Sequence, residues 1–129
     1  MRMFMKTSVG LLALLAIGCG GGSPTPRRIV SLSVQPSVAS PATGADSQFN
    51  ASATFSKPPS PAGVTPLMWL ETASDGWHQA PGLASVSQSG IAHCTGSGTT
   101  WITAVMSSGA LNTAGDPVLV RGTAQLNCP

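Results

Sequence analysis

The sequence predicts an all-β domain built as a sandwich of about seven strands. Three observations lead to this prediction. Short stretches alternate between apolar and polar residues, which is the period of a half-buried strand. Glycine and proline are frequent between these stretches, with 15 Gly and 11 Pro in 129 residues. No stretch repeats its apolar residues with a period of 3.6 between helix caps.

The expected strands follow one another closely along the chain. Val30, Leu32 and Val34 are predicted to share the buried face of the first strand, and Leu67 is predicted to share a face with Trp69. Alternating segments predict strands at residues 30–35, 38–40, 48–55, 67–70, 83–87, 91–94, 100–106 and 118–128. Between them we expect a rigid proline-rich loop at 57–63, turns at 75–76 and 89–90, and a polar hairpin loop at 107–117.

The N-terminus has the pattern of a secretory signal. A basic head at residues 1–6 precedes an apolar run at 9–18, and the run is too short to cross about 30 Å of hydrocarbon. The run ends at Cys19, and residues 15–19 (LAIGC) resemble the lipobox of bacterial lipoproteins. The alternatives are an ordinary cleaved signal or a short membrane anchor in which Cys19 is incidental.

The lipobox resemblance implies three parts of the chain. Residues 1–18 would be a signal peptide, 19–28 a lipidated N-terminus with a flexible linker, and 29–129 the folded domain. Cys19 would carry the acyl chains that hold the protein on a membrane facing an oxidising compartment. In a Gram-negative host, Gly20 after the cysteine, in place of Asp, implies the outer membrane. The resemblance therefore implies an exported protein, anchored by lipid in the cell envelope.

The charge of the mature chain argues against a nucleic-acid partner. Without Arg2 and Lys6, four basic residues remain against four acidic residues, so the formal net charge is zero. Nucleic-acid binding requires clustered lysine and arginine, and Arg27-Arg28 is the only basic pair.

The ordered segments of the domain resemble the group 2 bacterial immunoglobulin-like (Big) domains. The resemblance rests on residues 32–36 (LSVQP), 48–55 (QFNASATF), 68–69 (MW), 84–90 (ASVSQSG) and 98–104 (GTTWITA). It implies an immunoglobulin-like sandwich over about residues 29–126, and a surface module of structural or adhesive function without catalysis. The loop at 75–81 is longer than the family's usual link, and most such domains lack cysteines.

The chain has three cysteines, an odd number. If lipid occupies Cys19, as the lipobox implies, then Cys94 and Cys128 remain to form a disulfide in an oxidising compartment. Two free thiols are one alternative. The other is a metal site with His78 and His93, although the close cysteine pairs typical of zinc sites are missing.

The sequence carries no catalytic motif, so we expect no enzyme activity, cofactor or metal. It contains no Gly-x-Ser-x-Gly elbow, His-Glu-x-x-His motif or phosphate loop. Glu71 and Asp75 are interpreted as solvated loop charges, because a shared acid–base site at a strand end is disfavoured. Asp46, Glu71, Asp75 and Asp116 also lack the spacing of a calcium loop.

Tryptophans provide the remaining candidate contacts. Trp69 is expected in the core, Trp101 on the face opposite Ile102, and Trp77 in the long loop beside His78 and Gln79. Trp77 and Trp101 are either exposed contact residues or side chains that each cover an edge of the core. The first hypothesis is a non-catalytic module that contacts an envelope protein. The alternative is a carbohydrate-binding module that uses Trp77, His78, Gln79 and Trp101. A third hypothesis, a small enzyme, has little support.

Overall fold

The computed structural model describes residues 25–129; the signal segment, Cys19 and the linker up to residue 24 lie outside this range. Residues 25–129 hold ten strands and no helix, which confirms the all-β prediction. Within them there is consequently no helix that could span a membrane. The strands are β1 (Ile29–Gln35), β2 (Val38–Ala39), β3 (Asp46–Gln48), β4 (Asn50–Phe55), β5 (Ala62–Val64), β6 (Met68–Thr72), β7 (Ala84–Val86), β8 (Ile91–Cys94), β9 (Gly98–Leu111) and β10 (Pro117–Cys128).

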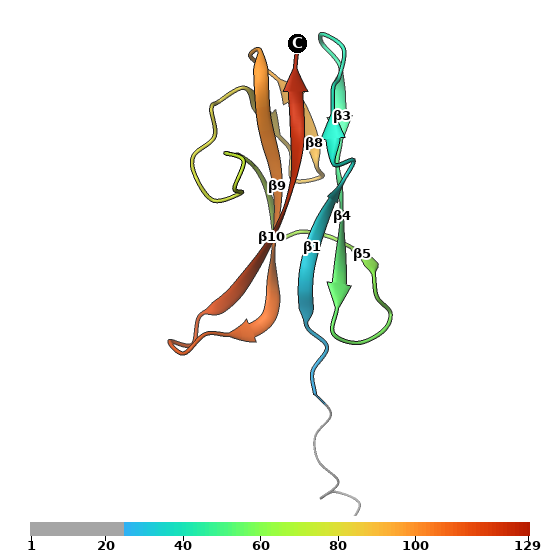
Figure 1. Cartoon of the computed structure of the whole chain (residues 1–129), viewed down its shortest axis with the longest axis vertical. Coiled ribbons are helices and arrows are strands. Elements are labelled where there is room, and N and C mark those ends of the chain that lie inside the picture. Colours follow the sequence, from blue (N-terminus) through green and yellow to red (C-terminus); the bar gives the residue numbers. More distant parts are fainter. Residues whose placement is uncertain (1–24) are drawn as a thin grey trace, which may run out of the picture.

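The strands form two layers. One layer is the sheet β2-β10-β9-β6, and the other contains the sheets β1-β4-β5 and β3-β8-β7. The latter two join end to end because only Phe49 separates β3 from β4. Figure 1 shows β1 and β4 side by side, with the long β9–β10 hairpin forming the other side of the molecule. The strand count exceeds the predicted seven for two reasons. The predicted strand at 48–55 is divided at Phe49 into β3 and β4, and the predicted loop at 57–63 ends in β5, which pairs with the edge of β4.

The first strand segment contributes to both layers. β1 pairs antiparallel with β4, and after Pro36 the chain crosses over, so that β2 pairs in parallel with β10. Close contact between the layers depends on Gly122 in β10. A Cβ atom at this position would lie 2.7 Å from the carbonyl oxygen of Leu32, so only glycine allows β10 to lie this near to β1.

The core lies between the two layers. Phe49, Ile102 and Leu126 are fully buried, and Trp69 is buried as predicted. The alternation predicted at residues 49–55 is confirmed, because the residues predicted to face inward are buried or partly buried from Phe49 to Phe55. In β10 it holds from Val120 to Cys128, whereas Val118, predicted to face inward with them, is exposed near the hairpin turn.

Two apolar residues lie on the opposite side from the prediction. Val30 is 64% exposed, because the pairing of β1 with β4 shifts register between Ile29 and Ser31. Ile29 therefore takes the buried position in place of Val30. Leu67 does not share the core face of Trp69: it precedes β6 and is 63% exposed.

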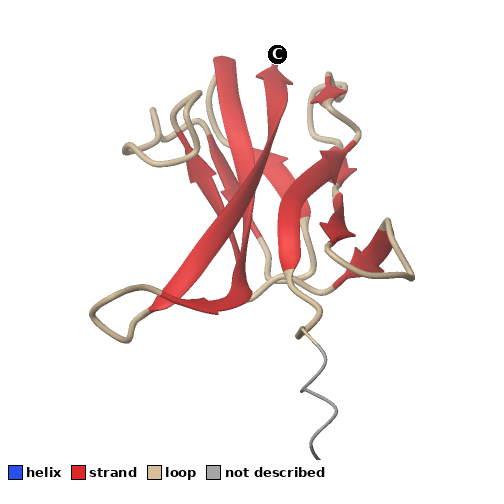
Figure 2. Ribbon diagram, turned by 60° about the horizontal axis from the view of Figure 1, so that its bottom comes forward, coloured by secondary structure: helices blue, strands red, loops and turns tan. Residues whose placement is uncertain are grey.

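The predicted polar loop at 107–117 is mostly strand. β9 continues to Leu111 and β10 starts at Pro117, so the loop is only 112–116. The side-chain oxygen of Asn112 accepts hydrogen bonds from the backbone N–H groups of Ala114 and Asp116 at 2.9 and 3.0 Å, which closes this turn. Figure 2 shows the resulting hairpin projecting at the end of the molecule where the described chain begins.

The open edge of β6 is covered by side-chain and loop contacts. The Gln88 side chain accepts a hydrogen bond from the Trp69 N–H and donates one to the Trp69 carbonyl, both at 3.3 Å. Further along the strand, Thr72 forms an isolated β-bridge with Gln79. The backbone of β6 therefore finds partners on both sides, although only β9 pairs with it as a strand.

Glu71 is a structural residue and not the solvated loop charge predicted from the sequence. One of its carboxylate oxygens accepts hydrogen bonds from the backbone N–H groups of Leu83 and Ala84 at 2.8 and 3.0 Å. The same oxygen accepts a bond from the Thr100 hydroxyl at 2.7 Å. Glu71 thus connects β6 to the start of β7 and to β9.

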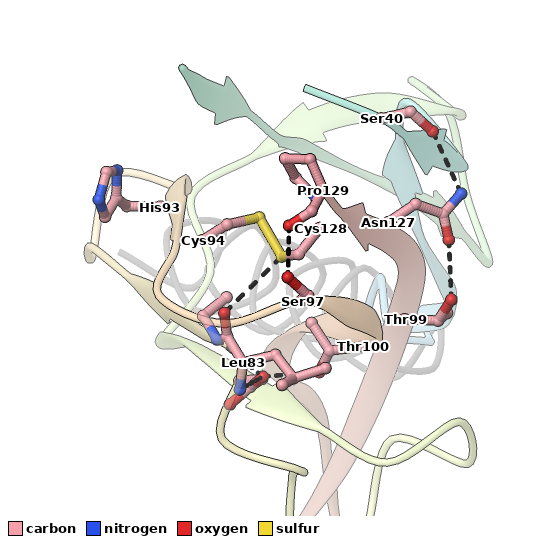
Figure 3. The surroundings of a disulfide bond; sticks show 12 residues. Ser40, Leu83, His93, Cys94, Ser97, Thr99, Thr100, Asn127, Cys128 and Pro129 are labelled. Carbon is pink, nitrogen blue, oxygen red and sulfur yellow. Dashed lines mark hydrogen bonds between the residues drawn. A yellow bond between two sulfur atoms is a disulfide. The ribbon is translucent and has the colours of Figure 1, made fainter. Parts of the chain in front are cut away.

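A disulfide joins Cys94 of β8 to Cys128 of β10, the pair predicted from the sequence. Because these strands belong to different layers, the bond connects the layers at the C-terminal end of the domain (Figure 3). Hydrogen bonds beside it also hold this end. The Ser97 hydroxyl donates to the Pro129 carbonyl at 2.7 Å, and the Asn127 amide donates to the Ser40 hydroxyl at 3.1 Å.

Candidate functional site

The candidate site is the loop of residues 73–83 between β6 and β7, which contains Trp77, His78 and Gln79. Asp75 gives this loop its shape. Its carboxylate accepts hydrogen bonds from the backbone N–H groups of Trp77 at 2.8 Å and His78 at 3.0 Å, and it also contacts the His78 ring. Gly76 follows with a φ of +77° and closes the turn through its N–H to Ala73. The predicted Asp75-Gly76 turn is therefore confirmed.

The same contacts fix the charge of Asp75. The backbone N–H groups of His78 and Trp77, followed by the His78 side chain, hold the pKa of this carboxyl well below its usual range. Asp75 is exposed to solvent and ionised at neutral pH, and its lowered pKa means that it keeps its charge to more acidic pH than an ordinary aspartate. A second exposed pair joins His93 to Asp46 at 2.7 Å on the paired strands β8 and β3.

The loop folds back onto the outer face of the β6-β9-β10 sheet. A Cβ atom at Gly76 would lie 2.7 Å from the Thr123 hydroxyl oxygen, so the loop backbone lies directly on β10. Beneath it, the hydroxyl groups of Thr72, Thr103 and Thr123 form a hydrogen-bonded row with distances of 2.8 and 3.0 Å. Thr103 is fully buried even though it points away from the core.

Arg121 holds the loop in place from β10. Its guanidinium lies 4.1 Å from the centroid of the Trp77 ring, and its Nη1 donates a hydrogen bond to the Gly76 carbonyl at 2.8 Å. The arginine thus supports the ring from below, and Trp77 nevertheless remains 64% exposed. Arg121 was not among the contact residues predicted from the sequence. A single arginine among small residues on the polar face of the last strand is the pattern that could have indicated its role.

The structure gathers three of the four predicted contact residues. Trp77, His78 and Gln79 are neighbours and all exposed. Trp101 lies on β9 and is only half-buried, directly opposite Thr72 of β6. Thr72 is paired with Trp101 on one side and with Gln79 on the other, so all three residues lie on the outer face of the sheet. Trp101 is on β9, and β6 therefore separates it from the loop that carries Gln79. Trp77 is therefore the principal exposed aromatic of this surface.

No protein-family model matches this chain, and no curated protein has a detectably similar sequence. The site must therefore be interpreted from its own residues. An ionised aspartate, two polar side chains and an aromatic ring on a fixed loop suit recognition of a partner surface. Within residues 25–129, no three side chains of His, Cys, Asp or Glu gather as a metal site would require.

A second hollow lies on the same domain and was not predicted. A cavity of about 500 Å³ opens between β4, β5, β6 and the turn after β7. Its floor contains Phe49 and Trp69, and its rim includes Val64, Pro66 and Gln88. Phe49 and Trp69 are almost completely buried, so these two aromatic rings offer little surface to a molecule in the hollow.

Replacing Arg121 with alanine is expected to loosen the loop and leave the sandwich folded. The substitution removes the cation–π contact and the hydrogen bond to Gly76, together worth about 1–2 kcal/mol. Hydrogen exchange at the amides of Trp77 and His78 should accelerate about tenfold. Gln125→Ala, two positions along the same face, is the control and should leave these amides unchanged. Equal protection in both variants would show that Arg121 does not hold the loop.

Proposed function

We propose that this chain is a non-catalytic, lipid-anchored module of the bacterial cell envelope with an immunoglobulin-like domain. The strand order supports the immunoglobulin-like assignment. One layer contains β1, β4 with β3, β8 and β7, which correspond to strands A, B, E and D of an immunoglobulin sandwich. The other layer contains β6, β9 and β10, which correspond to strands C, F and G. The basic head, the short apolar run and Cys19 support export and lipid anchoring.

The function of the domain, in this proposal, is to contact an envelope partner through the loop that carries Trp77. One observation carries it: Trp77 is 64% exposed and yet held by Arg121 and by the turn at Asp75. Exposing a large aromatic side chain to water is unfavourable in free energy. Exposed tryptophans are frequent anchors of protein interfaces, because a partner that covers the ring removes this exposure. Because the ring is fixed before binding, little conformational entropy is lost when a partner covers it.

The anchor is tested by Cys19→Ala. Without the thiol no acyl chain can be attached, so the protein should stop incorporating labelled palmitate. It should be either released from the membrane or stalled with its signal segment uncleaved. Ser23→Ala, in the same linker, is the matched control and should remain membrane-bound and labelled. The circular dichroism spectrum should be the same in both variants. If Cys19→Ala still incorporates labelled palmitate, the lipid anchor at Cys19 is wrong.

The partner is tested by cross-linking in intact cells with wild-type protein and Trp77→Ala. Truncation of an interface anchor typically reduces affinity by about 2 kcal/mol or more, roughly thirtyfold. A cross-linked envelope protein should therefore be lost with Trp77→Ala. Val30→Ala is the control, because Val30 is equally exposed but lies on β1. A partner captured equally by both variants would place the contact elsewhere.

A second candidate function is carbohydrate binding at the same loop. The favouring observation is that Arg121 contacts the Trp77 ring, which remains largely exposed beside the polar side chains of His78 and Gln79. A free aromatic face with adjacent hydrogen-bonding groups suits the apolar face and hydroxyl groups of a sugar. Binding on a glycan array should be lost with Trp77→Ala and weakened with Trp101→Ala. Binding that survives both substitutions would refute these residues as the sugar site.

A further inference from the structure

The end of the domain where the described chain begins carries three exposed apolar side chains. Leu111 is 68% exposed, and Val118 and Leu119 are each 39% exposed. All three lie at the tip of the β9–β10 hairpin, flanking the turn at 112–116. Figures 1 and 2 show this hairpin projecting beyond the sandwich at the same end as the N-terminal segment. These side chains contribute nothing to the core cluster.

The N-terminal segment is bound directly to this end. The Arg28 guanidinium donates a hydrogen bond to the carbonyl of Gly109 in the hairpin. Arg27 donates to the carbonyl of Lys57 at 3.1 Å, and the Lys57 ammonium donates to the carbonyl of Thr25. The chain therefore leaves the domain beside the hairpin, held by the loop after β4.

The same contacts gather positive charge. Arg27, Arg28 and Lys57 are three of the four cationic side chains in residues 25–129. Of the four carboxylates in that range, only Asp116 lies in the hairpin turn. Asp46 pairs with His93 on β8, and Glu71 and Asp75 lie at the far end of β6 and in the following loop. This end thus has a net positive charge beside an apolar tip.

The length of the remaining chain restricts what this surface can face. From Thr25 back to Cys19 is six residues, which span at most about 20 Å when fully extended. If Cys19 carries the lipid anchor, Thr25, where the chain leaves the domain beside the hairpin, must stay within that distance of the headgroups. An apolar tip beside cations is the pattern of a surface that rests on an anionic bilayer.

We propose that the tip formed by Leu111, Val118 and Leu119, with Arg27, Arg28 and Lys57, docks on the anionic lipid bilayer that holds the anchor. This inference rests on the proposed lipidation of Cys19. The apolar tip enters the headgroup region, and the cations lie over anionic headgroups, each raising occupancy of the docked state about fivefold. Docking gives the module a fixed orientation, with its C-terminal end directed away from the membrane.

The test attaches the anchor chemically, so that it does not depend on lipidation in the cell. Because Cys94 and Cys128 form the disulfide, Cys19 is the only thiol left in residues 19–129 to couple to a maleimide lipid in vesicles. Leu111→Trp places a reporter at the tip, and Val38→Trp places one on β2, where Val38 is also exposed at 51%. The vesicles contain phosphatidylcholine with or without phosphatidylglycerol, and brominated lipid serves as the quencher.

With phosphatidylglycerol, the added emission of Leu111→Trp should shift to shorter wavelength and be quenched by brominated lipid, whereas that of Val38→Trp should be unaffected. Pure phosphatidylcholine should weaken the effect by more than tenfold, since three cations are involved. Unshifted, unquenched emission from Leu111→Trp would overturn the proposal. The proposal would also be overturned if the protein formed a dimer in solution and Leu111→Asp abolished that dimer. The tip would then bind a second copy of the chain. Docking with the chemical anchor but no palmitate labelling in cells would refute only the lipidation.

Discussion

Replacing both Cys94 and Cys128 with alanine is expected to lower the free energy of unfolding by about 4 kcal/mol. The disulfide spans a sequence separation of 34 residues. In the chain-entropy model, closing a loop of this length removes about that much conformational freedom from the unfolded state. The bond also joins β8 to β10 across the two layers, so its loss frees the C-terminal strand to fray. A small domain commonly has only about 5–15 kcal/mol of net stability, so the effect is large.

Urea unfolding at neutral pH measures this difference, with the wild-type protein compared in the presence and absence of a reductant. The double-alanine variant should unfold at the same low urea concentration with or without reductant. Ser97→Ala is the matched control, because it removes only the neighbouring hydrogen bond to Pro129. Ser97→Ala should lower the free energy of unfolding by about 1 kcal/mol. If reduction does not change the wild-type midpoint, the bond does not stabilise the domain.

Gly90→Ala is expected to destabilise the domain by about 3 kcal/mol. Gly90 has a φ of +85°, a backbone conformation that costs an L-residue about 1–2 kcal/mol. A Cβ atom there would also lie 2.4 Å from the Phe49 carbonyl oxygen and 3.1 Å from the Trp69 ring. The Phe49 N–H donates its hydrogen bond to Gly90, so relief of the clash must move this pair and the buried ring.

The control for this substitution is Gly82→Ala. Gly82 has a similar φ of +80°, but a Cβ atom there would have no heavy atom within 4 Å. Gly82→Ala should therefore lower the free energy of unfolding only by the cost of the backbone conformation, about 1–2 kcal/mol. Comparing the two variants by chemical denaturation separates backbone strain from the steric clash. Equal destabilisation would show that the approach of Gly90 to Phe49 and Trp69 relaxes without cost.

The sequence predicted those strands in which one face is apolar and the other polar. Phe49 is buried as expected, because alternation with period two reports which face meets the core. Trp69 is buried as expected for a tryptophan in a sandwich of this kind. The prediction failed where pairing decides the structure. Residues 107–111 look like a polar loop, but β10 supplies backbone partners for β9 as far as Leu111. Val30 was misplaced because a register shift next to Ile29 has no mark in the pattern.

The candidate site was predicted only in part. The turn at Asp75 follows from local sequence, since it depends on neighbouring residues. The exposure of Trp77 does not, because whether the ring covers the edge of the core depends on how the loop packs. The support from Arg121 depends on how the loop folds onto β10, a contact between distant positions that one sequence does not encode in any local pattern. Glu71 was misjudged for the same reason, because its hydrogen-bond donors come from residues 83, 84 and 100.

The covered edge of β6 bears on self-association. An open strand edge is a template on which another molecule can add a strand, and this is a common start of aggregation. Here the Gln88 amide occupies both backbone groups of Trp69, and the bridge to Gln79 occupies Thr72. A second chain would have to displace these contacts before it could pair with β6. The edge is therefore protected by one glutamine side chain and one loop residue, which lets many copies be crowded together without forming intermolecular sheets there.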